Sequence, residues 1–202
     1  MFSDEELAFK AARGDKEAFA ELVRRYQKPI FAMAYRMVGN REDARDIAQE
    51  AFLKAYRALA RFKENSRFSP WLYSIANNLC IDALRRKGRN NVSLDEPLPD
   101  GGERQVAGGM DPLKELEKQE TSQQVQTAID ALPAKFKSVL LLRHMQELSY
   151  EEIAQTLGIP VSSVKTHLFR AREALRKQII SLEGEEERGE MSKTPVGAVS
   201  RR

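Results

Sequence analysis

The segment LSYEEIAQTLGIPVSSVKTHLFRAREALRK, residues 148–177, has the pattern of two short helices joined by a tight turn. Ser149, followed three residues later by Glu152, forms a capping box that predicts where the first helix starts. Gly158 supplies the left-handed residue of the turn, and Pro160 is tolerated where the next helix begins. A chain with this segment is therefore expected to form a helix-turn-helix.

The second half of this segment separates apolar from polar side chains along a helix. Its apolar residues recur every three or four positions: Val161, Val164, Leu168, Ala171 and Leu175. The remaining positions carry hydrogen-bond donors and positive charge: Ser162, Ser163, Lys165, Thr166, His167, Arg170 and Arg172. Such side chains suit base edges and phosphates when a helix lies in the major groove of DNA.

An ordinary helical hairpin with a solvated charged face fits the same composition, because charge runs are usually solvated. Small Ala154, Gly158 four residues on and Val164 six residues after that favour a DNA-binding helix-turn-helix, since they let two helices cross closely. We therefore predict that residues 148–177 bind DNA.

Length and composition limit the remaining possibilities. A chain of 202 residues suits one or two domains, and 42% hydrophobic with 31% charged residues supports small cores. No apolar run approaches the roughly 20 residues that span a membrane. The N-terminal sequence MFSDEELAFKAARGD is acidic and amphipathic, unlike a signal peptide. We therefore expect no membrane insertion and a reducing, cytoplasmic location.

Few residues are available for catalysis or metal binding. The single Cys80 excludes an internal disulfide and a cysteine-based zinc cluster, and we expect it to be a small core residue. With His144 and His167 as the two histidines, no metal site is indicated. The sequence shows no Ser/His/Asp set, paired acidic metal site or Gly-rich phosphate loop, so we expect neither an enzyme nor a cofactor.

Charge and composition divide the chain into four parts. Residues 1–87 carry a net charge of +5 and residues 113–182 a net charge of +2, which is typical of two modules that face nucleic acid. Residues 88–112 between them have a net charge of −3, are rich in Gly, Pro, Asp and Asn, and predict a flexible linker. Residues 183–202 contain a Glu run, which predicts a disordered tail.

Helical patterns dominate both modules, and there is no strand-like alternation or internal repeat. This predicts an all-α fold of two small helical domains joined by a flexible linker. The expected helices cover about 4–13, 16–38, 41–59 and 70–87 in the first domain, and about 113–132 and 134–146 before the helix-turn-helix in the second.

The helix expected at 41–59 has a face of mixed charge. The face consists of Arg41, Glu42, Asp43, Arg45, Asp46, Gln49 and Glu50. A solvated outer face with weak pairs four residues apart is one interpretation. A protein partner that reads the acidic residues is the other, and the residues alone do not decide between them.

The last helix of the first domain, with the loop before it, combines cations, aromatics and amides. These residues are Lys63, Asn65, Arg67, Phe68, Trp71, Tyr73, Asn77 and Asn78, followed by the basic run Arg85, Arg86, Lys87 and Arg89. Aromatic faces stack on unpaired bases while cations hold the backbone, and a flipped base needs amide or backbone partners. Alternatively, Phe68 and Trp71 anchor the core and the basic run favours the negative end of the helix. For Trp71 the two roles are compatible.

Three motifs occur in order around the linker: DIAQEAFLKAYRAL at 46–59, RFSPWLYSIANNLCIDALRRK at 67–87, and the segment at 148–177. Together they resemble the bacterial sigma factors of the extracytoplasmic-function (ECF) group of the sigma-70 family, over about residues 5–180. A helix-turn-helix alone is shared with many response regulators, whereas the three motifs at this spacing are specific. The resemblance implies a non-catalytic subunit that binds core RNA polymerase, recognises a promoter and helps to open the duplex.

The resemblance also implies a role for each part of the chain. Residues 1–87 correspond to region 2, which binds core polymerase and the minus-ten element and captures a flipped base of the single non-template strand. Residues 113–182 correspond to region 4, which binds the double-stranded minus-thirty-five element and the polymerase β flap. The β′ clamp coiled coil is implied to contact Asp43, Asp46, Gln49, Glu50 and Lys54. The minus-thirty-five element is implied to contact Ser162, Ser163, Lys165, Thr166, His167, Phe169, Arg170 and Arg172.

Members of this family are often held inactive by an anti-sigma factor, so the resemblance implies such a partner as well. His167 stands where the family often has an arginine, and the tail after Leu182 extends beyond the family core. Two other classes also fit the residues. One is a conventional activator or repressor that binds DNA with the second domain alone, and the other is an interaction protein that sequesters a regulator.

Overall fold

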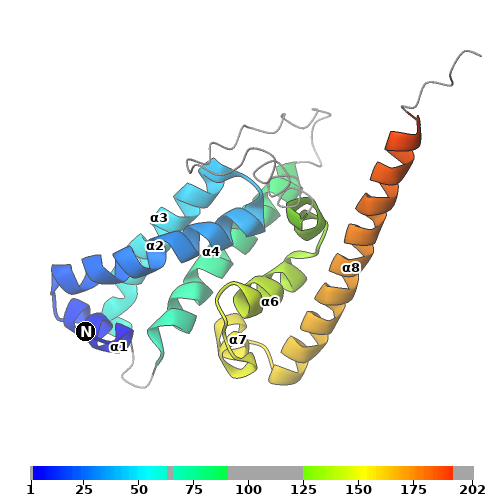
Figure 1. Ribbon diagram of the computed structural model, residues 1–202. Helices are drawn as coiled ribbons and strands as arrows, with labels where there is room; N and C mark the ends of the chain where they lie inside the picture. Colours follow the sequence, from blue (N-terminus) through cyan, green and yellow to red (C-terminus); the bar gives the residue numbers. More distant parts are fainter. Residues whose placement is uncertain (1, 63–65, 91–124, 193–202) are drawn as a thin grey trace, which may run out of the picture.

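The computed structural model describes residues 2–62, 66–90 and 125–192, and all regular structure within these ranges is helical (Figure 1). We call residues 2–90 the first domain and residues 125–192 the second. The first contains α1 (Asp4–Ala12), α2 (Lys16–Val38), α3 (Arg41–Ala58), the 3₁₀ turn η1 (Leu59–Arg61) and α4 (Phe68–Asn90). The second contains a helical stretch at 125–130, then α6 (Ala134–His144), α7 (Tyr150–Leu157) and α8 (Val161–Ser192). The prediction of an all-α fold is confirmed for these residues.

Side-chain caps start the long helices of the first domain. The Asp15 carboxylate accepts a hydrogen bond from the backbone N–H of Ala18 at the start of α2, at 3.0 Å. At α3, the Asn40 side chain accepts from the backbone N–H groups of Glu42 and Asp43, at 2.8 and 3.0 Å. These bonds satisfy donors that have no partner inside the helix, and they set where each helix begins.

The helix-turn-helix forms as the sequence predicts. The Ser149 hydroxyl accepts from the backbone N–H of Glu152 at 3.2 Å, while the Glu152 carboxylate accepts from the backbone N–H of Ser149 at 2.7 Å. The capping box is therefore complete at α7. Gly158 ends α7 with φ of 64°, a left-handed conformation that favours glycine.

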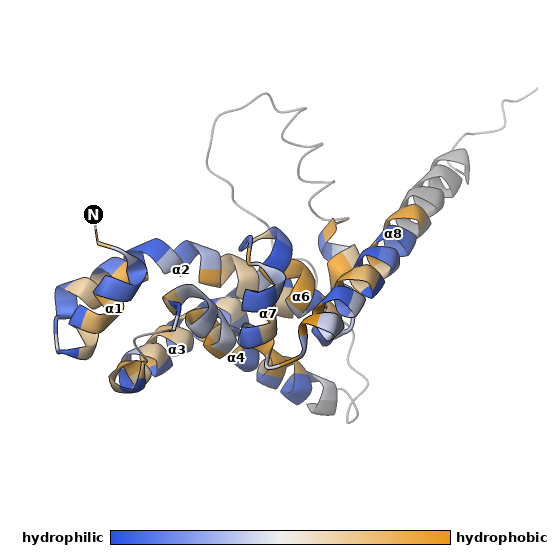
Figure 2. Cartoon of the chain, turned by 90° about the horizontal axis from the view of Figure 1, so that it is seen from below, coloured by the Kyte–Doolittle hydropathy of each residue, from blue (hydrophilic) through white to orange (hydrophobic). Residues whose placement is uncertain are grey.

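The two domains pack directly against each other. α2, α3 and α4 lie together, α7 contacts α4, and α6 contacts both α2 and α4. α8 lies on the side of α6 and α7 that faces away from the first domain, and it projects beyond the body (Figure 1). Buried residues of both domains form one continuous cluster, from Leu22 and Leu72 in the first to Leu142 and Leu168 in the second. Most helices accordingly have one hydrophobic and one hydrophilic side (Figure 2).

Two helices extend beyond their predicted bounds. α4 begins at Phe68, whose backbone N–H donates to the Glu5 carboxylate of α1 at 3.2 Å, and it ends at Asn90, inside the expected linker. α8 continues to Ser192, through a stretch in which we expected disorder. Glu, Arg and Met favour helices, and this propensity outweighs the charge run there. Residues 91–112 of the expected linker, the first part of the helix expected at 113–132, and the end of the tail lie outside the described residues.

Candidate nucleic-acid interface

One side of α8 is buried against α6 and α7, which leaves the opposite side in solvent. Val164, Leu168 and Ala171 are at most 2% exposed and anchor the helix. Because a helix repeats every 3.6 residues, the polar residues between these anchors point outward. The first domain does not cover this outer side (Figure 1).

The residues predicted to contact the minus-thirty-five element differ in accessibility. The exposed ones are Ser162, Lys165, Thr166, Phe169, Arg170 and Arg172, and the half-buried ones are Ser163 and His167. Phe169 is 68% exposed, which is unusual for a large aromatic side chain. Its ring is available for an apolar contact such as the methyl group of thymine.

Two side chains of α6 contact two of the predicted DNA-binding residues. The Phe136 ring meets the His167 ring edge to face, with centroids 5.7 Å apart. The Nε2 atom of His144 lies 3.4 Å from an Nη atom of Arg172. Burial, and then the charges of Arg172 and Arg143, lower the pKa of His144, so its neutral ring can accept a hydrogen bond from the guanidinium. α6 therefore restricts the orientation of His167 and Arg172.

The aromatic residue that begins α4 belongs to the core. Phe68 is 0% exposed and packs edge-on against Phe62 and Tyr26, with centroids 6.0 and 5.6 Å apart. Trp71 is half-buried and contacts both Phe62 and Phe68, at 5.2 and 5.7 Å. Phe68 therefore anchors the core, as the alternative interpretation held, and does not present a face to DNA. Trp71 combines core packing with partial access to solvent.

The two asparagines of α4 differ in burial. Asn77 is 2% exposed and its Oδ1 atom has no hydrogen-bond donor, so its position does not agree with the predicted contact to a base. Asn78 is exposed, as are Arg85 and Arg86 further along the helix. Successive helical side chains are rotated by about 100°, which is why adjacent asparagines face different surroundings. The predicted loop contacts that lie outside the described residues are Lys63 and Asn65.

The second domain contacts the start of α4 through polar side chains. The Arg67 guanidinium donates to the Glu152 carboxylate, and the Tyr73 hydroxyl donates to the side-chain oxygen of Gln146. Burial acts to raise the pKa of Glu152, but hydrogen bonds from Ser149 and the charge of Arg67 outweigh it and lower the pKa. Arg67, a predicted strand-binding residue, is thus paired with the second domain in this arrangement.

The mixed-charge face of α3 is accessible to a partner. Asp43, Asp46, Gln49 and Lys54 are exposed, and Glu50 is half-buried. Glu50 and Lys54 approach to 3.9 Å, and an exposed ion pair of this kind contributes little to stability. The face is therefore a surface that a partner can contact without first breaking a strong internal pair.

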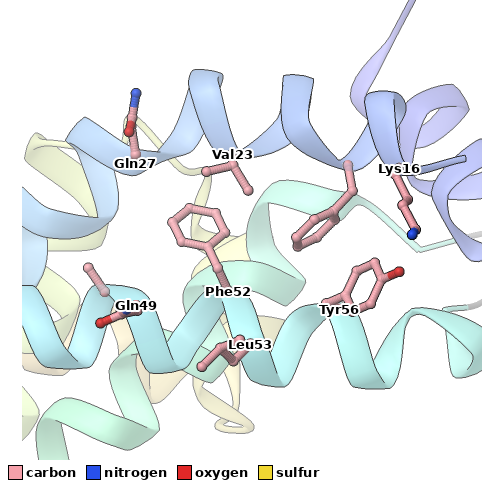
Figure 3. Close-up of a pocket in the computed structure, with 9 residues that line it drawn as sticks. Lys16, Val23, Gln27, Gln49, Phe52, Leu53 and Tyr56 are labelled. Carbon is pink, nitrogen blue, oxygen red and sulfur yellow. The ribbon is translucent and has the colours of Figure 1, made fainter.

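An apolar groove of about 510 Å³ lies beside this face, between α2 and α3 (Figure 3). The apolar residues that line it include Phe19, Val23, Phe52, Leu53 and Tyr56. Leu53 and Tyr56 remain 47% and 44% exposed, so part of the lining faces water. No pattern in the sequence predicted this groove. The one sequence feature that could have indicated the groove is Leu53, an apolar residue on the otherwise charged side of α3.

The described residues include no group of three or more His, Cys, Asp or Glu that could hold a metal ion. Across the same residues, none of the helices has the length and apolar character needed to cross a membrane. Cys80 is buried, as expected of a core residue, and burial raises the pKa of its thiol to about 12.

Within the described residues, the fold consists of two packed groups of helices, the second of which carries a helix-turn-helix, an architecture typical of DNA-binding proteins. Residues 22–90 match the family Sigma-70 region 2, and residues 122–175 match the family Sigma-70, region 4.

Two individual proteins that are similar to this chain along most of its length are sigma factors as well. The ECF RNA polymerase sigma factor SigW of Bacillus subtilis (strain 168) is 43% identical over 176 residues, which cover 84% of this chain and 93% of SigW. The ECF RNA polymerase sigma-E factor of Escherichia coli (strain K12) is 36% identical over 183 residues, covering 89% of this chain and 95% of that protein.

Two solved structures share the fold. CnrH, solved in complex with the cytosolic domain of CnrY, gives a TM-score of 0.65 at 24% identity and covers 88% of this chain and 97% of its own. The sigma factor RpoE of Bartonella quintana was solved in complex with the anti-sigma factor NepR. It gives a TM-score of 0.64 at 22% identity, and the match covers 80% of this chain and 96% of the RpoE chain.

The chain belongs to the sigma-70 family and is a sigma factor of its ECF group. The resemblance that the three sequence motifs carry is thereby confirmed.

Proposed function

We propose that this protein directs core RNA polymerase to promoters with two separated elements, and that it acts by binding rather than by catalysis. The observation that carries the proposal is the outer side of α8, where Lys165, Phe169 and Arg170 are exposed on a helix whose other side is buried in the core. A helix anchored in this way enters the major groove as a rigid element.

The minus-thirty-five element is read by α8. Arg170 and Lys165 supply positive charge and donors for guanine or phosphate, and Phe169 supplies an apolar contact. Thr166 donates its hydroxyl hydrogen to the backbone carbonyl of Ser162 at 3.0 Å, which positions the side chain close to the helix. The His167 ring is held in place by its contact with Phe136. We therefore expect the ring to contact a base in one fixed orientation.

The minus-ten element is bound by α4 and the loop before it. Trp71 and Asn78 are the accessible aromatic and amide, and Arg85 and Arg86 are exposed cations for the phosphate backbone. Phe68 supports this surface from below, through its ring contact with Trp71. Region 2 would then hold the displaced single strand while region 4 holds the upstream duplex.

Core polymerase docks on α3 and the groove beside it. The exposed carboxylates Asp43 and Asp46 favour a partner with positive charge, and the groove next to them favours apolar side chains on the same partner. A coiled coil such as the β′ clamp can present both on one helical surface. This favours the partner interpretation of the mixed-charge face, and we place the β flap contact on the second domain.

The other proposed properties follow from this role. CnrH and RpoE share the fold of this chain, and RpoE was solved with an anti-sigma factor, so we infer that an anti-sigma factor also binds this protein. Because its partners are core polymerase and promoter DNA, we place the protein in the cytoplasm. We propose no cofactor and no catalytic residue.

Run-off transcription tests this function. The purified protein is mixed with core polymerase and a genomic promoter library, with no other sigma factor present. We expect transcripts that start downstream of a shared pair of sequence elements. A conventional activator or repressor would give no transcript without a second sigma factor, and that result would contradict the proposal.

A further inference from the structure

Three polar residues of the second domain meet the C-terminal end of α2 in the first domain. The Gln126 side-chain N–H group donates to the backbone carbonyl of Arg36 at 3.5 Å, and the Lys137 ammonium donates to the backbone carbonyl of Met37 at 3.4 Å. The Asp130 carboxylate accepts from both donors, at 3.1 Å from Gln126 and 3.2 Å from Lys137. We call Gln126, Asp130 and Lys137 the cross-domain cap.

Lys137 is the central residue of this cap. It is 5% exposed, although a lysine is rarely buried unless its charge is paired. The last carbonyl groups of a helix have no partner within it, and the C-terminal end of a helix favours a cation. The Lys137 ammonium meets both requirements at once, because its acceptors are the Met37 carbonyl and the Asp130 carboxylate.

The end of α2 is shaped to receive the cap. Gly39 terminates α2 with φ of 73°, and a Cβ atom at this position would lie 3.4 Å from an Asp130 carboxylate oxygen. A side chain at this position would therefore be strained by the backbone conformation, and its Cβ atom would be in van der Waals contact with the carboxylate. Beside the cap, Leu141 of α6 packs into a buried cluster that includes Met37 and Cys80. The contact thus combines charge-assisted hydrogen bonds with apolar burial.

We infer that the cross-domain cap holds the two domains of the free protein closed. Separation of the domains would transfer Lys137 and the end of α2 to water and expose Leu141. The closed arrangement also keeps the second domain on the start of α4. There the Thr156 hydroxyl oxygen lies 3.3 Å from the Pro70 carbonyl oxygen, while its shorter hydrogen bond, at 2.7 Å, goes to the Glu152 carbonyl of α7. The closed arrangement leaves the α3 face accessible.

The closed arrangement has a functional consequence, which rests on the proposed function. Arg67 and Tyr73, at the DNA-binding end of α4, are hydrogen-bonded to the second domain while the domains are closed. Asp46 and Gln49, on the polymerase-binding face, stay exposed. Core polymerase can therefore bind the closed protein, whereas the single strand can bind α4 only after the domains separate.

The distance between the domains tests the inference without polymerase or DNA. Fluorophores are attached through Glu17→Cys on α2 and Arg176→Cys on α8, both exposed positions. The buried Cys80 thiol, with its pKa raised to about 12, does not compete for the label. Single-molecule energy transfer then measures the ratio of open to closed molecules.

Lys137→Met keeps the apolar stem and removes the charge. Hydrogen bonds to charged groups typically contribute enough to change an equilibrium about tenfold or more, so we expect the open-to-closed ratio to rise by about that factor. The control is Lys135→Met, two residues away on α6 and exposed, which should leave the ratio unchanged. Asp130→Asn, at a carboxylate whose side chain is 42% exposed, should open the protein less but in the same direction without disturbing the fold.

The inference is overturned if Lys137→Met and Asp130→Asn both keep the wild-type ratio, or if the wild-type protein is already mostly open. Circular dichroism of each variant shows whether it is folded. If Lys137→Met is unfolded, the comparison of Asp130→Asn with the wild-type protein decides. Binding of a single-stranded minus-ten oligonucleotide is measured separately. Variants that open without gaining DNA affinity would support the cap and contradict the proposed DNA role of α4.

Discussion

Leu53→Ala is expected to weaken the binding of core polymerase while leaving the protein folded. Leu53 lies in the apolar groove and keeps 47% of its surface exposed in the free protein. Complete burial of a leucine contributes about 2 kcal/mol, so covering the exposed half contributes about 1 kcal/mol. A loss of that size corresponds to roughly fivefold weaker binding.

The assay is a fluorescence anisotropy titration of labelled protein with core polymerase. Phe2→Ala is the matched control, because Phe2 is a similarly exposed apolar residue (52%) of the first domain that does not line the groove, and it should leave the affinity unchanged. Thermal unfolding of both variants verifies that the fold persists. Equal affinities for Leu53→Ala and wild type would refute the argument that the partner covers this groove.

Three further predictions concern the DNA-binding surfaces and the fold. Arg170→Ala should weaken binding to the minus-thirty-five element by about 1–3 kcal/mol if the guanidinium contacts a base, as measured by mobility shift of the holoenzyme, and unchanged binding would contradict that contact. Asn78→Ala should impair promoter opening more than closed-complex formation because the exposed amide would bind a flipped base, so permanganate reactivity equal to wild type would exclude this role. Ser149→Ala removes one half of the capping box at α7 and should lower the free energy of unfolding by about 1 kcal/mol in calorimetry, whereas Ser162→Ala, exposed near the start of α8, serves as the control for loss of a hydroxyl group.

Local features could be read from the sequence because they depend on residues that are close along the chain. The capping box of Ser149 and Glu152, the left-handed Gly158 and the apolar spacing of Val164 and Leu168 each involve positions within about one helical turn of each other. The outer face of α8 follows from the same spacing. The exposed face of this helix could therefore be located from the sequence, whereas its contact with DNA stays a prediction.

Residue composition alone did not separate surface from core at the start of α4. Phe68 and Asn77 have the chemistry of nucleic-acid contacts, yet both are buried, because α4 packs against other helices, chiefly α2, α3 and α7. Asn78, with the same side chain, is exposed one position later. The helical rotation turns the two asparagines to different sides, and helices distant along the chain, such as α2 and α7, decide which side of α4 is covered.

The sequence by itself determined the helices, their caps and the outward face of the helix-turn-helix, since these depend on backbone geometry and on spacing within a few residues. Only the tertiary structure decided how Lys137 is buried, why Arg67 is paired with Glu152, and where the groove beside α3 lies. Each of these joins groups that are distant along the chain, for example Lys137 and Met37, which are 100 residues apart. A buried ammonium is stable only when packing places hydrogen-bond acceptors next to it, and this packing cannot be predicted from the residues nearby in the sequence.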